Sequence, residues 1–326
     1  MLFSFSVQAK VWTVSQTPGA NFTTLSAAHA AAASGDTILV AGTPSVAYPG
    51  FTFTKKLYVF GPGFFLSQNT GLQADTNSAK IGACSFNSGS SGTVVMGMHF
   101  IGSININTNN ITLKRIRLEL TSGFVNGIVI ANNLNDITIT QSFLTLHSGG
   151  AVLISLGTLD SNIIIKNNFI EGLPTSYRTI DGSSAFTGSI SNNIIYAGHS
   201  TVGVDIDSPV FNNNIIRNGG INLNGSVTPY NNLCNGTQLA AINGNQQNVN
   251  MTSVFVSSGT SDGKWKIAEP GGPADGAGFG GVDCGMFDTS ENNAYVLSGV
   301  PPMPSIYEFT ANSDLSNVTV KAKSNN

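Results

Sequence analysis

Charged side chains are scarce in this chain. Of its 326 residues, 10% are Asp, Glu, Lys or Arg, against about 25% in ordinary soluble domains. The solvated surface must therefore consist largely of Asn, Ser, Thr and Gly, which is typical of extracellular repeat proteins and argues against a cytosolic enzyme. The net charge is −3 and no basic run occurs, so nucleic acid and anionic membranes are poor candidate partners. No apolar stretch reaches 18 residues, so no transmembrane segment is expected.

Cysteine is also rare, and the three residues Cys84, Cys234 and Cys284 lie far apart. This spacing excludes a zinc motif, and a disulfide involving Cys84 or Cys284 stays open. Cys234 falls on an inward repeat position, which favours a small core side chain. No phosphate-binding loop, nucleophile elbow or HExxH motif occurs, so the common cofactor and nucleophile chemistries have no sequence support.

A short pattern recurs along the chain, apolar-x-apolar-x-x-Asn-x-apolar, and its clearest copy is Ile163, Ile165, Asn168 and Ile170. We place the Asn position of successive copies at His99, Ile116, Ser142, Asn168, Asn193, Asn214 and Asn232. The copies are 17 to 26 residues apart. A unit of that size cannot bury its own apolar face, so the repeat predicts a solenoid.

Within each copy the apolar residues alternate, which is strand periodicity. Asn suits the tight turn that follows because it tolerates a left-handed backbone. We therefore expect Asn168, Asn193, Asn214 and Asn232 to stack as a ladder of hydrogen-bonded amides. A second strand follows each turn, at 127–130, 151–154, 179–180, 202–206 and 221–223. Two or three strands per coil predict an all-β fold, a parallel β-helix.

These repeats resemble the right-handed parallel β-helix proteins of the pectate-lyase-like superfamily, among them secreted bacterial β-helix proteins of unassigned function. Residues 22–40 resemble the capping helix and first strand of that family, and residues 262–278 resemble its irregular closing segment. The resemblance covers about residues 10–290. It implies the fold and leaves the function open, because this fold hosts lyases, hydrolases, adhesins and fibres.

Both ends of the chain differ in composition from the repeats. Residues 1–9 are apolar and end in Val-Gln-Ala, which we interpret as a signal-peptide remnant; an apolar first strand is the alternative. Residues 291–326 alternate like strands, with Pro301, Pro302 and Pro304 among them. We expect a β appendage that caps the last coil, with a docking segment for a surface anchor or secretion system as the alternative.

One set of outward residues is acidic. Counting from inward Ile180 and Ile206 predicts a cluster of Asp181, Asp205 and Asp207, with Arg178 and His199 close by. Crowded carboxylates raise a pKa or bind a cation, which gives two alternatives for this cluster, a general acid or a calcium site. The family resemblance implies calcium-assisted lyases, whereas a polygalacturonase is disfavoured because its paired Asp-Asp is missing. Solvated turn residues are the simpler alternative.

A second outward column places Glu171, Tyr196 and Arg217 on successive coils, where they would grip a sugar. A cross-strand ladder without a ligand is the alternative. We therefore expect a secreted or cell-surface protein with a structural, adhesive or glycan-binding role, without catalysis. The alternatives are a calcium-assisted polyuronate lyase and a self-associating subunit of an extracellular fibre. No cofactor is expected for the non-catalytic role, and calcium is the alternative.

Overall fold

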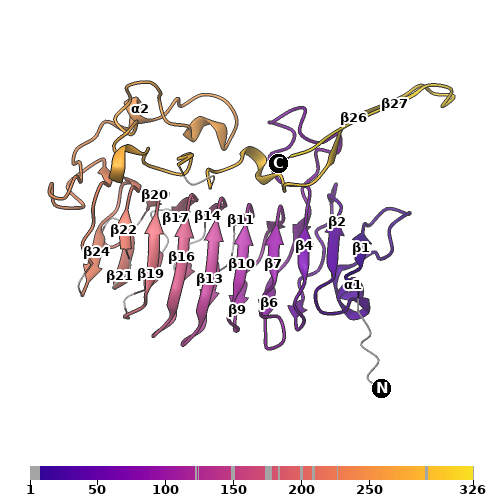
Figure 1. The fold of residues 1–326 in the computed structure, drawn as a ribbon, viewed down its shortest axis with the longest axis horizontal. Coiled ribbons are helices and arrows are strands. Elements are labelled where there is room, and N and C mark those ends of the chain that lie inside the picture. Colours follow the sequence, from indigo (N-terminus) through magenta and orange to yellow (C-terminus); the bar gives the residue numbers. More distant parts are fainter. Residues whose placement is uncertain are drawn as a thin grey trace, which may run out of the picture.

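The computed structural model describes residues 8–121, 123, 125–147, 151–172, 178–182, 184–198, 201–207, 210–225, 227–290 and 293–325. Three long sheets of parallel strands wind into a right-handed parallel β-helix (Figure 1). The predicted fold class is confirmed. Residues 1–7, which include most of the predicted signal remnant, lie outside the described residues. Among the described residues, no helix combines the length and apolarity needed to cross a bilayer.

From β4 to β24, each coil contributes one strand to each of three sheets. The first sheet contains β1 (Val11–Val14), β2 (Thr37–Val40), β4 (Tyr58–Phe60), β7 (Val94–Met96), β10 (Ile111–Lys114), β13 (Asn135–Thr140), β16 (Ser161–Lys166), β19 (Gly188–Ser191) and β22 (Val210–Asn212). The second contains β5 (Lys80–Ile81), β8 (His99–Phe100), β11 (Arg117–Leu120), β14 (Phe143–Leu146), β17 (Phe169–Gly172), β20 (Ile194–Ala197), β23 (Ile215–Arg217) and β25 (Leu233–Cys234). The third contains β3 (Thr52–Phe53), β6 (Cys84–Phe86), β9 (Ile104–Ile106), β12 (Ile128–Ile130), β15 (Val152–Ser155), β18 (Arg178–Gly182), β21 (Val204–Asp207) and β24 (Ile221–Asn224).

The core consists of inward side chains that stack from coil to coil. Ile137 lies beside Ile163, and Ile139 beside Ile165, and all four are fully buried. Burying one such side chain stabilises the fold by about 1.5–3 kcal/mol. Because β-branched residues fit a pleated, buried strand, the Ile-rich repeat favours this packing over a helix.

The turn between the first and second sheets contains a buried amide ladder. The backbone N of Asn168 donates to Oδ1 of Asn193 at 3.0 Å, and Asn193 repeats this bond to Asn214. Asn214 does the same to Asn232, and Asn232 to Asn245. Asn245 was not predicted as a member. The repeat itself is missing there, since Asn245 follows Asn232 by only 13 residues.

The residue before each ladder position has a left-handed backbone, and its side chain points outward. This outer column comprises Arg115, Gln141, Asn167, Asn192, Asn213 and Asn231, with φ between 52° and 56°. Asn accepts this conformation more readily than other non-glycine residues. The paired Asn-Asn sequences therefore have two roles: the first Asn turns the chain, and the second extends the ladder.

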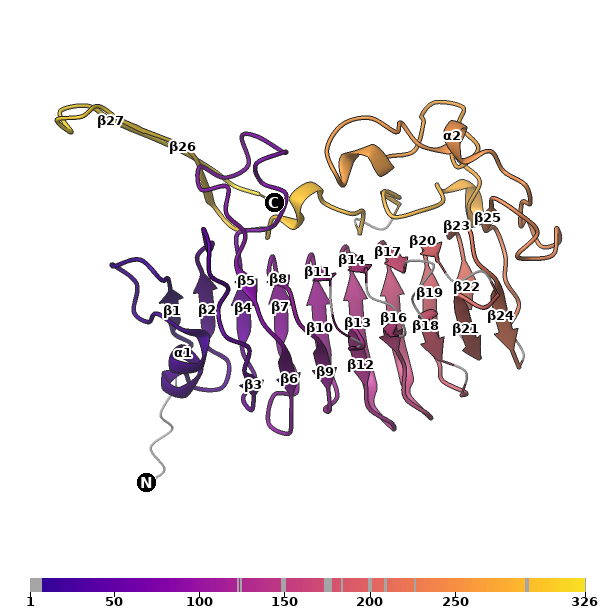
Figure 2. The same ribbon diagram turned by 180° about the vertical axis from the view of Figure 1, so that it is seen from behind.

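The outer column holds a segment that returns along the stack. From the last coil towards the first, its side chains hydrogen-bond Ala277, Phe279, Asp283 and Asp288, Met286, Ala294 and Val300. This returning segment, residues 250–300, includes α2 (Met251–Val254) and 3-10 helices at Gly263–Trp265, Phe279–Gly281 and Leu297–Gly299. It lies along one side of the stack in both views (Figure 2). The predicted closing segment therefore covers a flank and not an end.

Beneath the returning segment, the outer face of the second sheet carries an apolar column. Its members are Phe143, Phe169, Ile194, Ile215 and Leu233. They pack in one buried cluster with Phe255, Met286 and Tyr295 of the returning segment. This second core explains why the residue directly after each ladder position is apolar although its side chain faces outward.

The first coil is capped by α1 (Leu25–Ala31), as predicted. Thr24 caps its N-terminus by accepting a hydrogen bond from Ala27 N. At the other end, Lys55 Nζ donates to carbonyls of His29, Ala30 and Ala32, a favourable place for a cation. Leu25 and Ala28 are buried in the main core, so the helix closes the end of the solenoid.

Two expectations about position are wrong. The C-terminal strands β26 (Ser305–Ala311) and β27 (Val318–Lys323) pair as an antiparallel hairpin. The hairpin lies near the first coils and not over the last one, because Ser298 to Pro301 reach Phe64 and Gly97. In the 94–101 copy the repeat is shifted by one residue, since Val95, not Met96, pairs with Leu113. Met98 therefore takes the ladder position, and His99 faces outward beside Arg117.

Candidate functional site

The acidic cluster predicted on the third sheet is split by the strand register. Asp181 on β18 lies opposite Asp205 on β21, whereas Asp207 lies two residues further along, opposite Asn224. Counting failed because Ile180 is level with Val204 and not with Ile206. His199 lies outside the described residues.

Arg178 joins the two neighbouring carboxylates. Its Nη1 lies 2.7 Å from Oδ1 of Asp181, and its Nη2 lies 2.8 Å from Oδ2 of Asp205. Asn222 and Asn224 donate to the other oxygen of Asp205 at 2.9 and 2.8 Å. The guanidinium supplies the positive charge that a bound cation would otherwise bring. In the part of the chain that the structure describes, no group of three His, Cys, Asp or Glu side chains is arranged to hold a metal ion.

Arg178 and Asp181 also differ from expectation in their setting. The interval between residues 172 and 184 is long, so the sequence predicts an inserted loop that carries Arg178 and Asp181. They are instead part of the regular strand β18. Their side chains therefore belong to a sheet surface and not to an inserted loop.

The second predicted column is brought together. Glu171 on β17, Tyr196 on β20 and Arg217 on β23 are direct neighbours across the second sheet, about 4.8 Å apart along the stack. His147 Nε2 lies 3.7 Å from Oε2 of Glu171. All three column residues are partly exposed, so the column is open to a ligand.

The returning segment adds a tryptophan to this column. Arg217 lies 5.1 Å from the ring centre of Tyr196 and 5.1 Å from that of Trp265. Trp265 is fixed from below by Phe169, with ring centres 4.6 Å apart. The backbone of Lys264 and Trp265 turns in a 3-10 helix. We call Glu171, Tyr196, Arg217 and Trp265 the aromatic-charged strip.

A small hollow of about 190 Å³ opens at the Trp265 end of the strip. Arg217, Lys264 and Ser257 contribute polar groups to its lining. The indole Nε1 of Trp265 is buried and has no hydrogen-bond partner among the described residues. Sequence reasoning missed Trp265, since it lies 48 residues beyond Arg217 in an irregular segment without repeat spacing. Tryptophan's rarity, two in the chain, was the only signal available.

Towards the first coils the same column continues through Thr145 to Glu119. Oε1 of Glu119 pairs with Arg117 Nη2 at 2.6 Å. Nε2 of His99 lies 3.3 Å from the other oxygen but falls short of hydrogen-bond geometry. Contact with His99, aided by Arg117, lowers the pKa of Glu119 to about 2. At His99, burial disfavours the charged imidazole more than the Glu119 carboxylate favours it. The pKa of His99 is therefore lowered, and the imidazole is neutral at pH 7.

The three cysteines take no part in the strip. All are free and buried, which leaves no disulfide at Cys84 or Cys284. Burial raises the pKa of Cys84 to about 11, and those of Cys234 and Cys284 to about 12. Because the thiolate is the reactive form, these side chains are inert core residues.

The strip therefore offers an aromatic surface, a guanidinium and a carboxylate side by side on the outside of the solenoid. In general, such a combination of groups suits a polar ligand with apolar faces. No protein-family model, curated protein or solved structure matches this chain.

Proposed function

We propose that this chain is a secreted or cell-surface β-helix protein that binds a polysaccharide along the aromatic-charged strip. We also propose that the chain belongs to the pectate-lyase-like superfamily. The observation that carries it is the Arg217 guanidinium between the rings of Tyr196 and Trp265. Low overall charge supports an extracellular location.

The chemistry of the strip suits sugars. The C–H faces of a sugar ring pack against aromatic rings, and its hydroxyls bond to carboxylate and guanidinium groups. Arg217 and Lys264 lie at one end of the strip, which favours a carboxylated sugar there. Glu171 and His147 at the other end favour a neutral sugar residue.

The arrangement supports binding rather than catalysis. A glycosidase needs a carboxylic acid that keeps its proton near neutral pH. Glu119, the other carboxylate of this column, has a pKa near 2 and stays ionised. The Asp181 and Asp205 carboxylates are paired with Arg178, so the polyuronate lyase has less support as a second candidate.

The test is a panel of acidic and neutral polysaccharides measured by isothermal titration calorimetry, with Tyr196→Ala and Arg217→Ala. We expect one polysaccharide class to bind, and each substitution to weaken binding by about tenfold, or about 1.4 kcal/mol. The matched control is Tyr58→Ala, which removes a tyrosine with a cation 5.6 Å from its ring on another sheet.

Three results would contradict this proposal. The first is that no polysaccharide of the panel binds. The second is that Tyr58→Ala weakens binding as much as the strip substitutions do. The third is that the protein degrades a polysaccharide. For the last, unsaturated ends and reducing ends are followed with and without Ca²⁺. Calcium-dependent unsaturated product that disappears in Asp181→Ala would establish the lyase instead.

A further inference from the structure

The C-terminal hairpin has one polar face and one apolar face. Pairing Phe309 with Val320 and Ala311 with Val318 places these four side chains on one face, together with Ile306 and Ala322. Glu308, Thr310, Thr319 and Lys321 lie on the other. The exposed fractions of Ile306, Phe309, Val318 and Val320 are 48, 59, 50 and 52%. Nothing that the structure describes covers this apolar face.

Among the described residues, the hydrogen bonds that join the hairpin to the rest of the chain lie near its base. Ser305 Oγ donates to Leu72 O at 3.0 Å, and Lys323 Nζ donates to Gly71 O at 2.6 Å. Beyond the base the two strands project away from the stack (Figures 1 and 2). An isolated two-stranded hairpin is at best marginally stable in water. Its apolar face therefore needs a surface to pack against.

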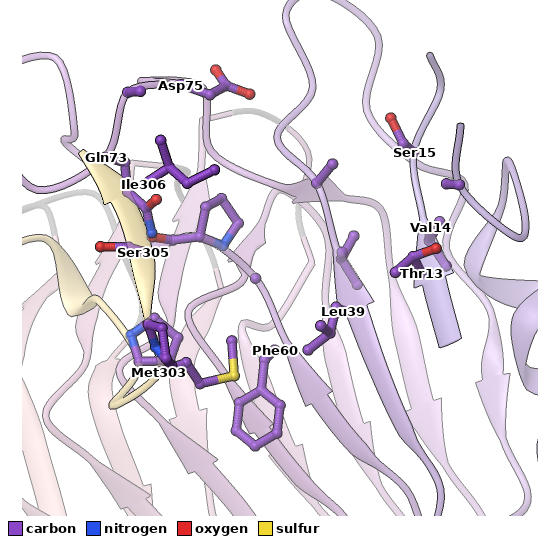
Figure 3. Close-up of a pocket in the computed structure, with 18 of the residues that line it drawn as sticks. Thr13, Val14, Ser15, Leu39, Phe60, Gln73, Asp75, Met303, Ser305 and Ile306 are labelled. Carbon is purple, nitrogen blue, oxygen red and sulfur yellow. The ribbon is translucent and has the colours of Figure 1, made fainter. Parts of the chain in front are cut away.

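A groove of about 1000 Å³ opens at the hairpin base, beside β1, β2 and β4 (Figure 3). Leu39, Phe60 and Met303 line it together with Ile306 and Phe309. The last two residues also belong to the hairpin face, so the groove and the face form one continuous apolar surface. Exposed apolar surfaces of this extent mark interaction sites.

We propose that this surface binds the same surface of a second copy of the chain, around a two-fold axis. Each hairpin would then lie against the groove and hairpin of its partner, in an isologous contact. Twenty-one residues line the groove. With Ala311, Val318, Val320 and Ala322 of the hairpin face, this reaches the about 20–30 residues that each side of a standard interface contributes.

Electrostatics permit this contact. Asp75 is the one charged residue that lines the groove, and its Oδ1 accepts hydrogen bonds from Asn77. On the polar face of the hairpin, Lys321 Nζ pairs with Glu308 Oε2 at 2.9 Å. Apart from Asp75 of each copy, the two apolar surfaces therefore bring no charged side chain into the contact. A second copy is also the one partner present wherever the chain is present.

Sedimentation velocity of the full chain over a range of concentrations tests the proposal. We expect a monomer–dimer equilibrium, and Phe309→Glu and Val320→Glu should each raise the dissociation constant about 30-fold or more. Thr319→Glu, next to Val320 on the polar face, is the matched control and should leave the dimer intact. Circular dichroism checks that the solenoid stays folded.

A monomer at every concentration would overturn the proposal, as would a dimer that survives both Phe309→Glu and Val320→Glu. An open series of larger assemblies would overturn the two-fold arrangement and favour the fibre subunit. The glycan panel is independent of these outcomes, since β26 and β27, which carry Phe309 and Val320, project away from β17 and β20 of the strip (Figure 1).

Discussion

At the scale of single residues, the buried amides of the ladder have no substitute. Nδ2 of Asn193 donates to Ile165 O, Ser191 O and Asn214 Oδ1, while its Oδ1 accepts two bonds from Asn168. No other uncharged side chain of this size offers two donors and an acceptor in one plane. This explains why Asn recurs at the position.

We predict that Asn193→Ala lowers the free energy of unfolding by about 1–3 kcal/mol for each buried group left without a partner. Urea unfolding followed by circular dichroism measures the loss. Asn105→Ala is the control, because Asn105 is an outward, partly exposed asparagine on β9. Equal effects of the two substitutions would mean that the ladder adds nothing specific.

Acid sensitivity also arises from single residues. The pKa of Glu119 is about 2 in the folded chain, against 4.5 ordinarily. Its contribution to stability is therefore present above pH 4.5 and is lost as the pH falls towards 2. The lowered pKa of His99 acts in the same direction, since its stabilisation is present above pH 6.5 and is lost as the imidazole is forced to protonate.

We therefore expect the Tm to fall steadily from pH 7 to pH 3. In Glu119→Gln, the Tm should depend less on pH below pH 4.5. Thermal unfolding across this range, by circular dichroism, gives the profile. Glu308→Gln is the matched control, a more exposed glutamate that also pairs with a cation. If the Tm of Glu119→Gln falls with pH below 4.5 as steeply as that of the unchanged chain, Glu119 is not the source of the acid sensitivity.

At the scale of elements, the returning segment depends on one buried carboxylate. Asp262 is fully buried. Its Oδ1 accepts hydrogen bonds from Asn69 and Thr260, and its Oδ2 from Ser298 N and Tyr295 OH. Residues from the loop after β4 and from two parts of the returning segment therefore meet at this side chain.

We predict that Asp262→Ala releases the returning segment while the solenoid stays folded, because several buried donors lose their acceptor together. Limited proteolysis should then cleave within residues 250–300, with the β-sheet signal in circular dichroism retained. In the control Asp275→Ala, an exposed residue of the same segment is changed, and cleavage should stay slow. Loss of the β-sheet signal in Asp262→Ala would show that segment and solenoid fold as one unit.

The whole molecule shows which features a repeat can reveal. Alternating Ile and Val with recurrent Asn predicted the strands, the coils and four ladder members, because each depends on contacts between equivalent positions. The strip of Glu171, Tyr196 and Arg217 was found in the same way. Counting aligned Ile180 with Ile206, whereas the structure pairs Ile180 with Val204. The count failed because coils differ in length, so equivalent positions on the third sheet are not evenly spaced in the sequence.

The sequence does not predict three features: the place of Trp265 in the strip, the contacts of the outer column, and the position of the hairpin. All three depend on a chain reversal between residues 235 and 300, and no periodicity records where an irregular segment is placed. The outer column was visible as the first Asn of each pair. Its partners, such as Ala277 and Met286, contribute backbone carbonyls, which leave no trace in the sequence.

The return of the chain also sets the order in which the molecule can be completed. Phe64 donates its backbone N–H to Ser298 O, and Pro301 lies against Gly97, so early coils are covered by residues near the C-terminus. Synthesis proceeds from the N-terminus, and these coils emerge from the ribosome long before their cover. During that interval the nascent solenoid exposes the apolar flank of the second sheet, and only full-length chains shield it.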